Sequence, residues 1–301
     1  MNSVEPNFQS FLNQHHLHEK KVVLMVSGGV DSMVLLSLCS KFLKPENITV
    51  LHINHNTRLN CQKEAELVKE ICTQNNITFV QETLEKVPSK NQEQFWRTAR
   101  QKAAETVKKQ TQSDIILTAH HATDLIETVL FRITKGGGLK SFCPFETKNK
   151  PLWNISKQAL INYAQAQNIL WYEDETNHNT KFARNKIRQQ VLPTLKEITP
   201  NLEKVFVTQA QNLAEYADYI KTQVPSYKKV PLKEFLQWHV VLQKEWLKKH
   251  AQHNFSAKEL HETLHWLTHN PAGNTVKIFS HTTLKLEKNQ LFFIPQNHKQ
   301  H

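Results

Sequence analysis

The first 135 residues alternate short apolar segments with longer amphipathic ones. Short apolar runs without polar interruption are typical of strands buried on both faces, and the segments between them are long enough for helices. We therefore expect strands at 22–26, 48–53, 77–80 and 115–118, and helices at 31–42, 64–74, 92–109 and 122–133. This alternation predicts βαβ units and a doubly wound, mostly parallel α/β sheet with helices on both faces.

The pattern changes after about residue 150. A helix at 156–168 with Ser156 as its N-cap, a basic helix from Arg184 and a long helix at 202–222 are expected in turn. Beyond Pro225 and Pro231 the sequence predicts helices near 232–250 and 256–268, and strands at 276–278 and 284–293. We expect three parts: an N-terminal catalytic domain at 1–200, a helical connector at 201–225 and a small α/β C-terminal domain at 226–301.

Composition narrows the classes of function. The 301 residues carry a formal net charge of +11, and the commonest polyanion faced by so basic a protein is nucleic acid, although a merely basic surface is the alternative. The sequence shows no apolar run long enough to span a bilayer and no signal peptide. Its four cysteines form no Cys-x-x-Cys pair, which disfavours a disulfide framework, a zinc ribbon or an iron–sulfur site. We expect a cytoplasmic protein that has no membrane partner.

Five of the six glycines lie in two loops, Gly28-Gly29 and Gly136–Gly138. The first belongs to Ser27-Gly28-Gly29-Val30-Asp31-Ser32, between a predicted strand and a predicted helix. Backbone N–H groups, a helix N-terminus and two hydroxyls suit a phosphate there. Asp31 would repel that phosphate unless a divalent cation bridged them, which indicates Mg²⁺. The alternative is an ordinary strand–helix turn.

Other charged residues follow the later strands. Asp124 and Glu127 are three apart on one helix and share a face, either as a ligand-binding pair or as carboxylates that complement the helix dipole. His120 and His121 follow the fourth strand, and at most one of them is expected to contact a ligand. Two basic groups are candidates for phosphate or carboxylate binding, with a solvated basic face as the alternative. They are Arg97 with Arg100, and Lys181, Arg184, Lys186 and Arg188.

His261-Glu262-Thr263-Leu264-His265 matches the HExxH pattern of zinc proteases. With 17 histidines in the chain, a chance match is far more common than for the glycine loop, and no third ligand has the expected spacing. We expect no zinc hydrolysis from it, and the sequence specifies no other set of metal ligands.

The glycine loop resembles the signature of the PP-loop ATP pyrophosphatases, which cleave ATP to AMP and pyrophosphate. Further segments resemble the tRNA(Ile)-lysidine synthetases over most of the chain. They are His52-Ile53-Asn54-His55 with Arg58, Asn91-Gln92-Glu93 with Arg97 and Arg100, Ala119-His120-His121-Ala122-Thr123-Asp124-Leu125-Ile126-Glu127-Thr128, Lys150-Pro151-Leu152, Asp174-Glu175-Thr176-Asn177, Arg184-Asn185-Lys186-Ile187-Arg188 and Leu192-Pro193. In two departures, Trp96 replaces an alanine, and Lys135-Gly136-Gly137-Gly138 replaces an Arg-Gly-x-Gly loop.

The resemblance implies an adenine-nucleotide α-hydrolase-like fold and ligation of free L-lysine to C2 of the wobble cytidine of tRNA(Ile) with a CAU anticodon. ATP and Mg²⁺ would be the cofactors, an adenylated cytidine the intermediate, and residues 226–301 a tRNA-binding domain. The pair Asp124 and Glu127 would bind lysine, with Asp124 as the preferred base. The implied roles are catalysis by Asp31, Asp124, Glu127 and Arg97, ATP binding by Ser27, Gly28, Gly29, Val30, Asp31, Ser32 and His52, and substrate binding by Arg100, His121, Lys135, Arg184 and Arg188.

Three other functions stay open. A PP-loop tRNA thiolase would need a Cys-x-x-Cys motif or a catalytic cysteine pair, whereas the cysteines here are isolated at 39, 61, 72 and 143. A ligase that does not act on nucleic acid is disfavoured by the charge of +11. A tRNA-binding protein that has lost activity is disfavoured by the intact Ser27, Asp31, Asp124 and Glu127. An oligomer is compatible with the sequence.

Overall fold

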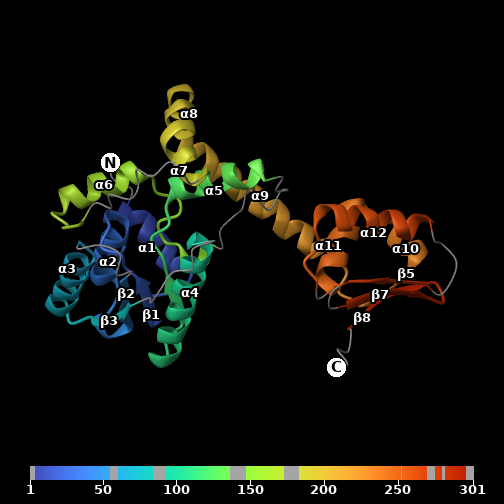
Figure 1. Ribbon diagram of the computed structural model, residues 1–301, viewed down its shortest axis with the longest axis horizontal. Helices are drawn as coiled ribbons and strands as arrows, with labels where there is room; N and C mark the ends of the chain where they lie inside the picture. The colour runs from blue at the N-terminus through green and yellow to red at the C-terminus, as the bar shows by residue number, and fades with distance from the viewer. Residues whose placement is uncertain are drawn as a thin grey trace. The chain divides into compact units, whose positions relative to one another are not determined.

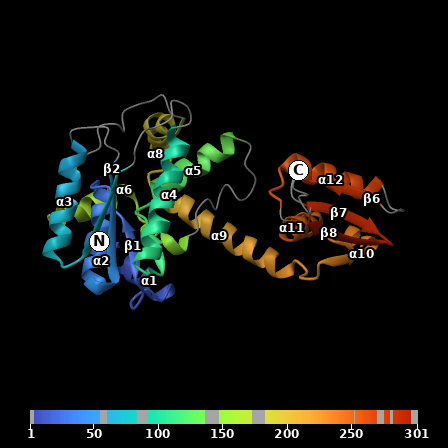
Figure 2. The same ribbon diagram turned by 60° about the horizontal axis from the view of Figure 1, so that its bottom comes forward.

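The structure is a computed structural model that describes residues 4–54, 60–83, 92–135, 147–172, 183–251, 253–269, 275–279 and 282–295. It divides into two compact units, residues 1–210 and 211–301 (Figures 1 and 2). The boundary lies within the helix α9, Leu202–Gln223, which confirms the long helix expected there. None of the helices in the described ranges is long and apolar enough to cross a membrane.

Four parallel strands form the sheet of the first unit in the order β3-β2-β1-β4. Their bounds are Val22–Met25 for β1, Ile48–Asn54 for β2, Thr78–Thr83 for β3 and Ile115–Leu117 for β4. The chain adds β2 and β3 on one side of β1 and then returns to place β4 on the other side. The strand order thus reverses between β1 and β4, and parallel sheets bind ligands beyond the carboxyl ends of the strands at such a point.

Helices cover both faces of this sheet, as the apolar strands predict. Alternate side chains of β1, such as Val22 and Leu24, pack with one set of helices, while Val23 packs with Ala104 and Val107 of α4 on the other face. The first set comprises α1 (Val4–Gln14), α2 (Val30–Phe42), α3 (Asn60–Gln74) and α6 (Lys157–Ala166), and α4 spans Gln92–Gln110. Two short 3₁₀ turns are η1, Pro45–Asn47, and η3, Thr147–Asn149. The doubly wound parallel fold is confirmed.

The helix α5, Ala122–Thr134, leaves the carboxyl end of β4 and is packed from behind by α9. Val207 and Ala210 of α9 contact the apolar side of α5 at Ala122, Leu125 and Val129. Leu202 joins a second cluster with Ile126 and Ile187. The position of α5 is therefore fixed by buried contacts on the side opposite its carboxylates.

The structure differs from the sequence prediction at two places in this unit. Helix α1 was not predicted, yet Phe8 and Leu12 on one of its faces are fully buried. The basic helix expected from Arg184 is present but contains a π-helical turn: α7 (Ala183–Lys186), η5 (Ile187–Val191) and α8 (Leu192–Ile198) follow one another without a break. Pro193 has no N–H for the regular hydrogen-bond ladder, which agrees with the irregular turn just before it.

The second unit combines an antiparallel sheet, in the order β5-β8-β7-β6, with the helices α10, α11 and α12. Its core includes the fully buried Trp246, Phe235 and Leu284. The predicted helix at 232–250 is two helices that meet at Trp238 and His239, and the stretch at 284–293 contains a hairpin turn at Lys288-Asn289, whose φ values are 50° and 61°. The elements are β5 (Lys229–Pro231), α10 (Leu232–Gln237), α11 (Val240–His250), α12 (Ala257–His269), β6 (Thr275–Ile278), β7 (Thr282–Glu287) and β8 (Gln290–Pro295).

Candidate active site

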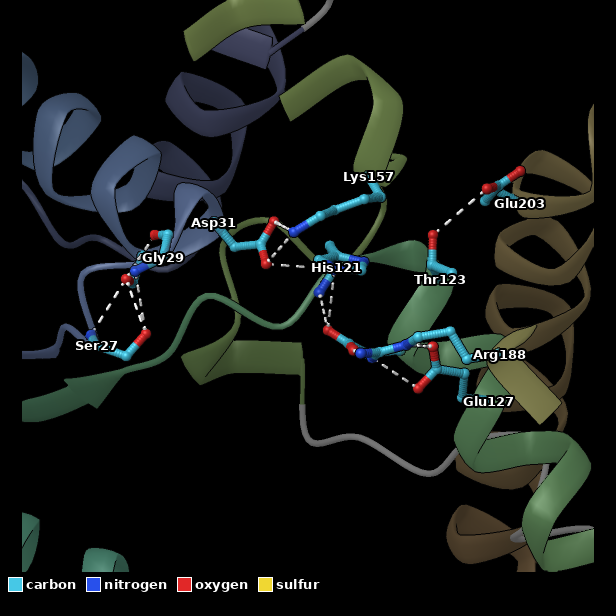
Figure 3. A network of polar contacts seen from close by, with 11 residues as sticks. Ser27, Gly29, Asp31, His121, Thr123, Glu127, Lys157, Arg188 and Glu203 are labelled. Carbon is cyan, nitrogen blue, oxygen red and sulfur yellow. Dashed lines mark hydrogen bonds and ion pairs between the residues drawn. The ribbon is translucent and has the colours of Figure 1, made fainter. Parts of the chain in front are cut away.

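The glycine loop connects β1 to α2 and is held by its own serine hydroxyls (Figure 3). Ser32 Oγ donates to the Gly29 carbonyl at 2.9 Å and accepts from the Ser27 N–H at 3.2 Å, and the two hydroxyl oxygens lie 3.2 Å apart. Gly29 is the N-cap of α2, and Val30 and Asp31 form its first turn. The structure thus places the six predicted loop residues at a helix N-terminus, the geometry that binds phosphate.

Gly28 has a backbone conformation that only glycine adopts without strain. Its φ is +91°, and a Cβ atom there would lie 3.1 Å from Glu64 Cβ. Its carbonyl also accepts a hydrogen bond from the Tyr172 N–H at 3.0 Å. At Gly29, by contrast, φ is −77° and the nearest atom to an added Cβ is Ser27 Oγ at 3.7 Å.

His52 lies on β2 next to this loop and is 2% exposed. Its Nδ1 is 2.9 Å from the Val26 carbonyl oxygen, and its ring stacks on Phe79. Burial lowers the pKa of His52, so the neutral imidazole is favoured and Nδ1 can donate to that carbonyl. His52 therefore supports the residue that precedes the loop, and its role in binding ATP stays a prediction.

Asp31 forms a close ion pair with Lys157, the first residue of α6. The Lys157 ammonium lies 2.7 Å and 2.6 Å from the two carboxylate oxygens of Asp31. Sequence reasoning placed a helix here, correctly capped by Ser156, but did not identify Lys157 as a site residue. The two residues are 126 positions apart, and the sequence pattern alone gives no sign that they meet.

Asp124 and Glu127 face the same side of α5, as their spacing predicts, and both contact Arg188 on η5. Arg188 donates from Nε and Nη2 to the two Glu127 oxygens at 2.6 Å and 3.0 Å, and Nη2 is 3.5 Å from Asp124 Oδ1. Figure 3 shows the guanidinium of Arg188 turned toward Glu127. We predicted Arg188 as a substrate-binding residue, but here its guanidinium contacts the two carboxylates.

The environments of these carboxylates move their pKa values in opposite directions. Burial raises the pKa of Glu127 above its usual value despite the lowering effect of Arg188. Burial also acts to raise the pKa of Asp124, but His121, His120, the hydrogen bond from the His121 backbone N–H and Arg188 together outweigh it, and the pKa lies below its usual value. Glu127 is therefore the better proton acceptor of the two and Asp124 the more firmly ionised.

His121 connects the glycine loop with the α5 carboxylates and is 4% exposed. Its Nε2 lies 3.7 Å from Asp31 Oδ2 and 3.5 Å from Asp124 Oδ2, and its backbone N–H donates to Asp124 Oδ2 at 3.0 Å. The other ring nitrogen, Nδ1, is buried without a hydrogen-bond partner among the described residues. His121 thus places Asp31 and Asp124 on either side of one imidazole.

A second polar contact holds α5 from behind. Thr123 Oγ1 donates to Glu203 Oε1 at 3.4 Å, and Lys196 pairs with the same oxygen at 2.6 Å. Glu203 is in the first turn of α9, so this contact joins the start of α5 to the start of α9. It reinforces the apolar packing between the two helices.

The remaining predicted cations form two groups. The positive charges of Arg97 and Arg184 act on Arg132, whose pKa is lowered first by burial and then by these neighbours. Lys135 and Arg184 both lie against the Phe131 ring, at 5.9 Å and 5.4 Å from its centre. Arg132 was not among the predicted residues.

Arg100 and Lys150 act in the same way on His120, whose pKa is lowered first by desolvation. The charge of Arg97 thus acts on Arg132, and that of Arg100 acts on His120. The glycine loop at 136–138, Arg58, Lys181 and the segment 174–177 lie outside the described residues.

Comparison with known proteins agrees with this geometry. Residues 1–195 match the PP-loop domain family. The chain belongs to the PP-loop family. Membership of the PP-loop family implies the use of ATP, and it confirms the resemblance that the glycine loop predicted.

Curated relatives that the chain resembles are tRNA(Ile)-lysidine synthases. The enzyme of Lactiplantibacillus plantarum is 30% identical, over 82% of this chain and 61% of its own length. The enzyme of Enterococcus faecalis is 35% identical, over 64% of this chain and 43% of its own length. The chain thus spans about half the length of the curated relatives it matches. Among solved structures, the U34-tRNA thiolase NcsA of Methanococcus maripaludis has a TM-score of 0.59 at 16% identity, covering 71% of this chain and 78% of that one, a likeness of fold alone.

The donor set of this PP-loop site fits a cation that is shared with phosphates. No group of three or more His, Cys, Asp or Glu in the described part of the chain is arranged to hold a metal ion by itself, and this includes His261 and His265 on α12. Mg²⁺ typically uses only one or two carboxylates together with water and substrate phosphates. Asp31, beside the loop, can supply one such oxygen.

The two glycines of the loop should respond differently to substitution. Gly28→Ala places a Cβ at positive φ against Glu64 and should lower the free energy of unfolding by about 1–3 kcal/mol. Gly29→Ala, the matched control, has room for its methyl group and should change it by less than about 0.5 kcal/mol. Urea unfolding followed by circular dichroism measures both, and equal effects would contradict the backbone assignment.

Removal of Arg188 should destabilise the protein, because Glu127 is buried and would lose the positive charge that pairs with it. Arg188→Met leaves that carboxylate without its bidentate partner, which raises its pKa further and destabilises the ionised form. We expect the free energy of unfolding to fall by about 2 kcal/mol at pH 7.5. This is less than the loss typical of a fully buried ion pair, because the Arg188 side chain is 39% exposed. The loss should fade as the pH falls to 5, because protonation of Glu127 removes the unpaired charge.

Urea unfolding at the two pH values measures this dependence. The control is the double variant Arg188→Met with Glu127→Gln, which has no carboxylate at position 127 to titrate. Its free energy of unfolding should therefore differ from that of the unchanged protein by nearly the same amount at both pH values. A loss in Arg188→Met that is the same at both pH values would show that the ion pair is not its cause.

Proposed function

We propose that this protein is an ATP-dependent ligase that joins L-lysine to C2 of the wobble cytidine in tRNA(Ile) with a CAU anticodon. The C2 oxygen is adenylated with release of pyrophosphate, and the ε-amine of lysine then attacks C2 and displaces AMP. The observation that carries the proposal is the junction at His121, which lies between the carboxylate of the phosphate loop and a pair of carboxylates suited to a cationic substrate. The names of the relatives support the same reaction.

The first half-reaction is assigned to the loop between β1 and α2. Its glycines, hydroxyls and helix N-terminus would bind the ATP phosphates, and Asp31 would share Mg²⁺ with them. The cation supplies charge neutralisation for the pyrophosphate that leaves. The loop lacks the GxxxxGK[ST] pattern, which agrees with attack at the α-phosphorus and not with transfer of the γ-phosphate.

The second half-reaction is assigned to Asp124 and Glu127. A lysine ammonium is not a nucleophile until it loses a proton, so the site needs both an ionic partner and a base. Asp124, with its lowered pKa, suits the ionic partner, and Glu127, with its raised pKa, suits the proton acceptor. This revises the preference for Asp124 as the base that the sequence suggested, while both residues stay in the lysine site.

The tRNA is assigned to the cations beside this site. Arg97, Arg132 and Arg184 come from three helices, and such a concentration of guanidinium groups suits phosphodiester oxygens. Arg100, Lys135 and the unit at 211–301 are proposed to add to the tRNA surface, in keeping with the net charge of +11. Substrates of this kind, together with free lysine and ATP, support a cytoplasmic location for the reaction.

The described cysteines do not support the alternative function, a tRNA thiolase. Cys39 and Cys72 are buried, and burial raises the pKa of both thiols, that of Cys72 to about 12. A buried thiol with a raised pKa is a poor nucleophile. Cys61 and Cys143 lie outside the side chains that the structure describes. The thiolase with a similar fold shares only 16% of its residues with this chain.

The proposal is tested by incubating the chain with ATP, Mg²⁺, labelled lysine and a transcript of tRNA(Ile) with a CAU anticodon. Lysine should become stably attached to the RNA only when ATP is present, and a tRNA(Met) transcript with the same anticodon should remain unlabelled. Absence of lysine incorporation, with ATP-dependent sulfur transfer to a tRNA instead, would support the thiolase. Inactivity in both assays with retained tRNA binding would support the binding protein.

Asp124→Asn should reduce lysine incorporation by at least about 100-fold, because the ionic partner of the ammonium is lost. Binding of the tRNA, measured by filter retention, should change little. Asp114→Asn is the control, since Asp114 is a carboxylate at the start of β4 that accepts the Lys21 N–H at 2.9 Å, away from the site. Equal losses of tRNA binding and incorporation in Asp124→Asn would contradict its assignment to lysine.

A further inference from the structure

Lys157 has a position that the stability of its own helix does not explain. It is the first residue of α6, directly after the N-cap Ser156. The N-terminus of a helix carries a partial positive charge, so a lysine there is unfavourable unless another group compensates it. Asp31 is that group, with both of its carboxylate oxygens within 2.7 Å of the ammonium.

The ion pair lies at the phosphate loop and remains open to solvent. The Lys157 side chain is 37% exposed and that of Asp31 is 26% exposed. Figure 3 shows the Lys157 side chain extending from α6 to the Asp31 carboxylate, with the glycine loop on the other side of Asp31. A flexible lysine with its end at the surface can change partner without disturbing the core.

Two demands on Asp31 conflict in this arrangement. An oxygen of Asp31 must face the cation if it is to share a divalent cation with ATP, yet the Lys157 ammonium contacts both oxygens. A second positive charge beside the ammonium would also be repelled. Lys157 must therefore leave Asp31 when the cation arrives, and it would then lie next to the phosphates that the loop binds.

We propose that Lys157 exchanges partners, from Asp31 in the ligand-free protein to a phosphate oxygen of ATP when the nucleotide binds with its divalent cation. This rests on the proposed use of the loop for ATP and assigns a residue that the motif does not contain. In the ligand-free protein Lys157 weakens cation binding at Asp31. In the bound protein it contributes a charge-assisted contact to the phosphates. Cation and nucleotide binding are coupled as a result.

The exchange predicts effects of opposite sign in Lys157→Met. Without nucleotide, Mn²⁺ binding followed by electron paramagnetic resonance should become about tenfold tighter, because the competing ammonium is gone. Binding of pyrophosphate without metal, measured by calorimetry, should become about tenfold weaker, because a phosphate contact is lost. Lys157→Arg should keep pyrophosphate binding close to that of the unchanged protein. A lysine that only stabilised the loop would weaken both ligands on removal.

The control is Lys41→Met, which removes a similar ion pair from the same helix α2. Lys41 lies 2.7 Å from Glu5, away from the loop, and its loss should change neither binding constant. Mn²⁺ affinity that is unchanged or lower in Lys157→Met, or unchanged pyrophosphate affinity, would overturn the exchange. If the unchanged protein binds ATP while Lys157→Met shows no such effects, only the exchange fails; if it binds neither ATP nor pyrophosphate, the ATP site itself fails as well.

Discussion

Three carboxylates lie close together at the carboxyl edge of the first sheet, and their mutual repulsion is the constraint that the rest of the site must meet. Asp31 comes from the first turn of α2, and Asp124 and Glu127 from the start of α5. Lys157 and Arg188 bring two positive charges to these three negative ones, and His121 lies between Asp31 and Asp124. The three carboxylates and the two cations together carry one excess negative charge, which suits an incoming cation such as a lysine ammonium.

The fold holds this cluster in place through elements that do no chemistry. The sheet order places the ends of β1 and β4 side by side, so the glycine loop and the start of α5 must be neighbours. Contacts of α9 with the back of α5 leave its carboxylates on the opposite side, and η5 presents Arg188 to them. π-helical turns are rare overall, but those that occur are often at functional sites. Here the turn η5 carries Arg188, whose positive charge pairs with the buried carboxylate of Glu127.

Sequence reasoning recovered the elements whose signal is local. The apolar strands, the glycine loop and the three-residue spacing of Asp124 and Glu127 each predict a feature that the structure contains. Helix α1 was missed although Val4, Phe8, Phe11 and Leu12 have helical spacing and are buried, so that signal was present and unused. The turn η5 was not predicted because the sequence from Arg184 indicated only a basic helix.

The ion pairs of the site could not be predicted in the same way. Asp31 and Lys157 are 126 residues apart, and Glu127 and Arg188 are 61 apart. Their contact follows from the packing of α6 against α2 and of η5 against α5, which no local pattern encodes. The proximity of Arg97 to Arg132 and Arg184 is a further consequence of three-dimensional packing.

The central proposal is that the phosphate loop and the carboxylate pair form one site, in which an RNA base is first adenylated and lysine then attacks that base and displaces AMP. The most direct test supplies ATP labelled at the α-phosphorus, with Mg²⁺ and the CAU-anticodon tRNA(Ile), but without lysine. The account predicts that label becomes attached to the RNA and is released as AMP when lysine is added. Label that never reaches the RNA, while lysine is still incorporated, or label on the RNA that lysine cannot discharge, would contradict it.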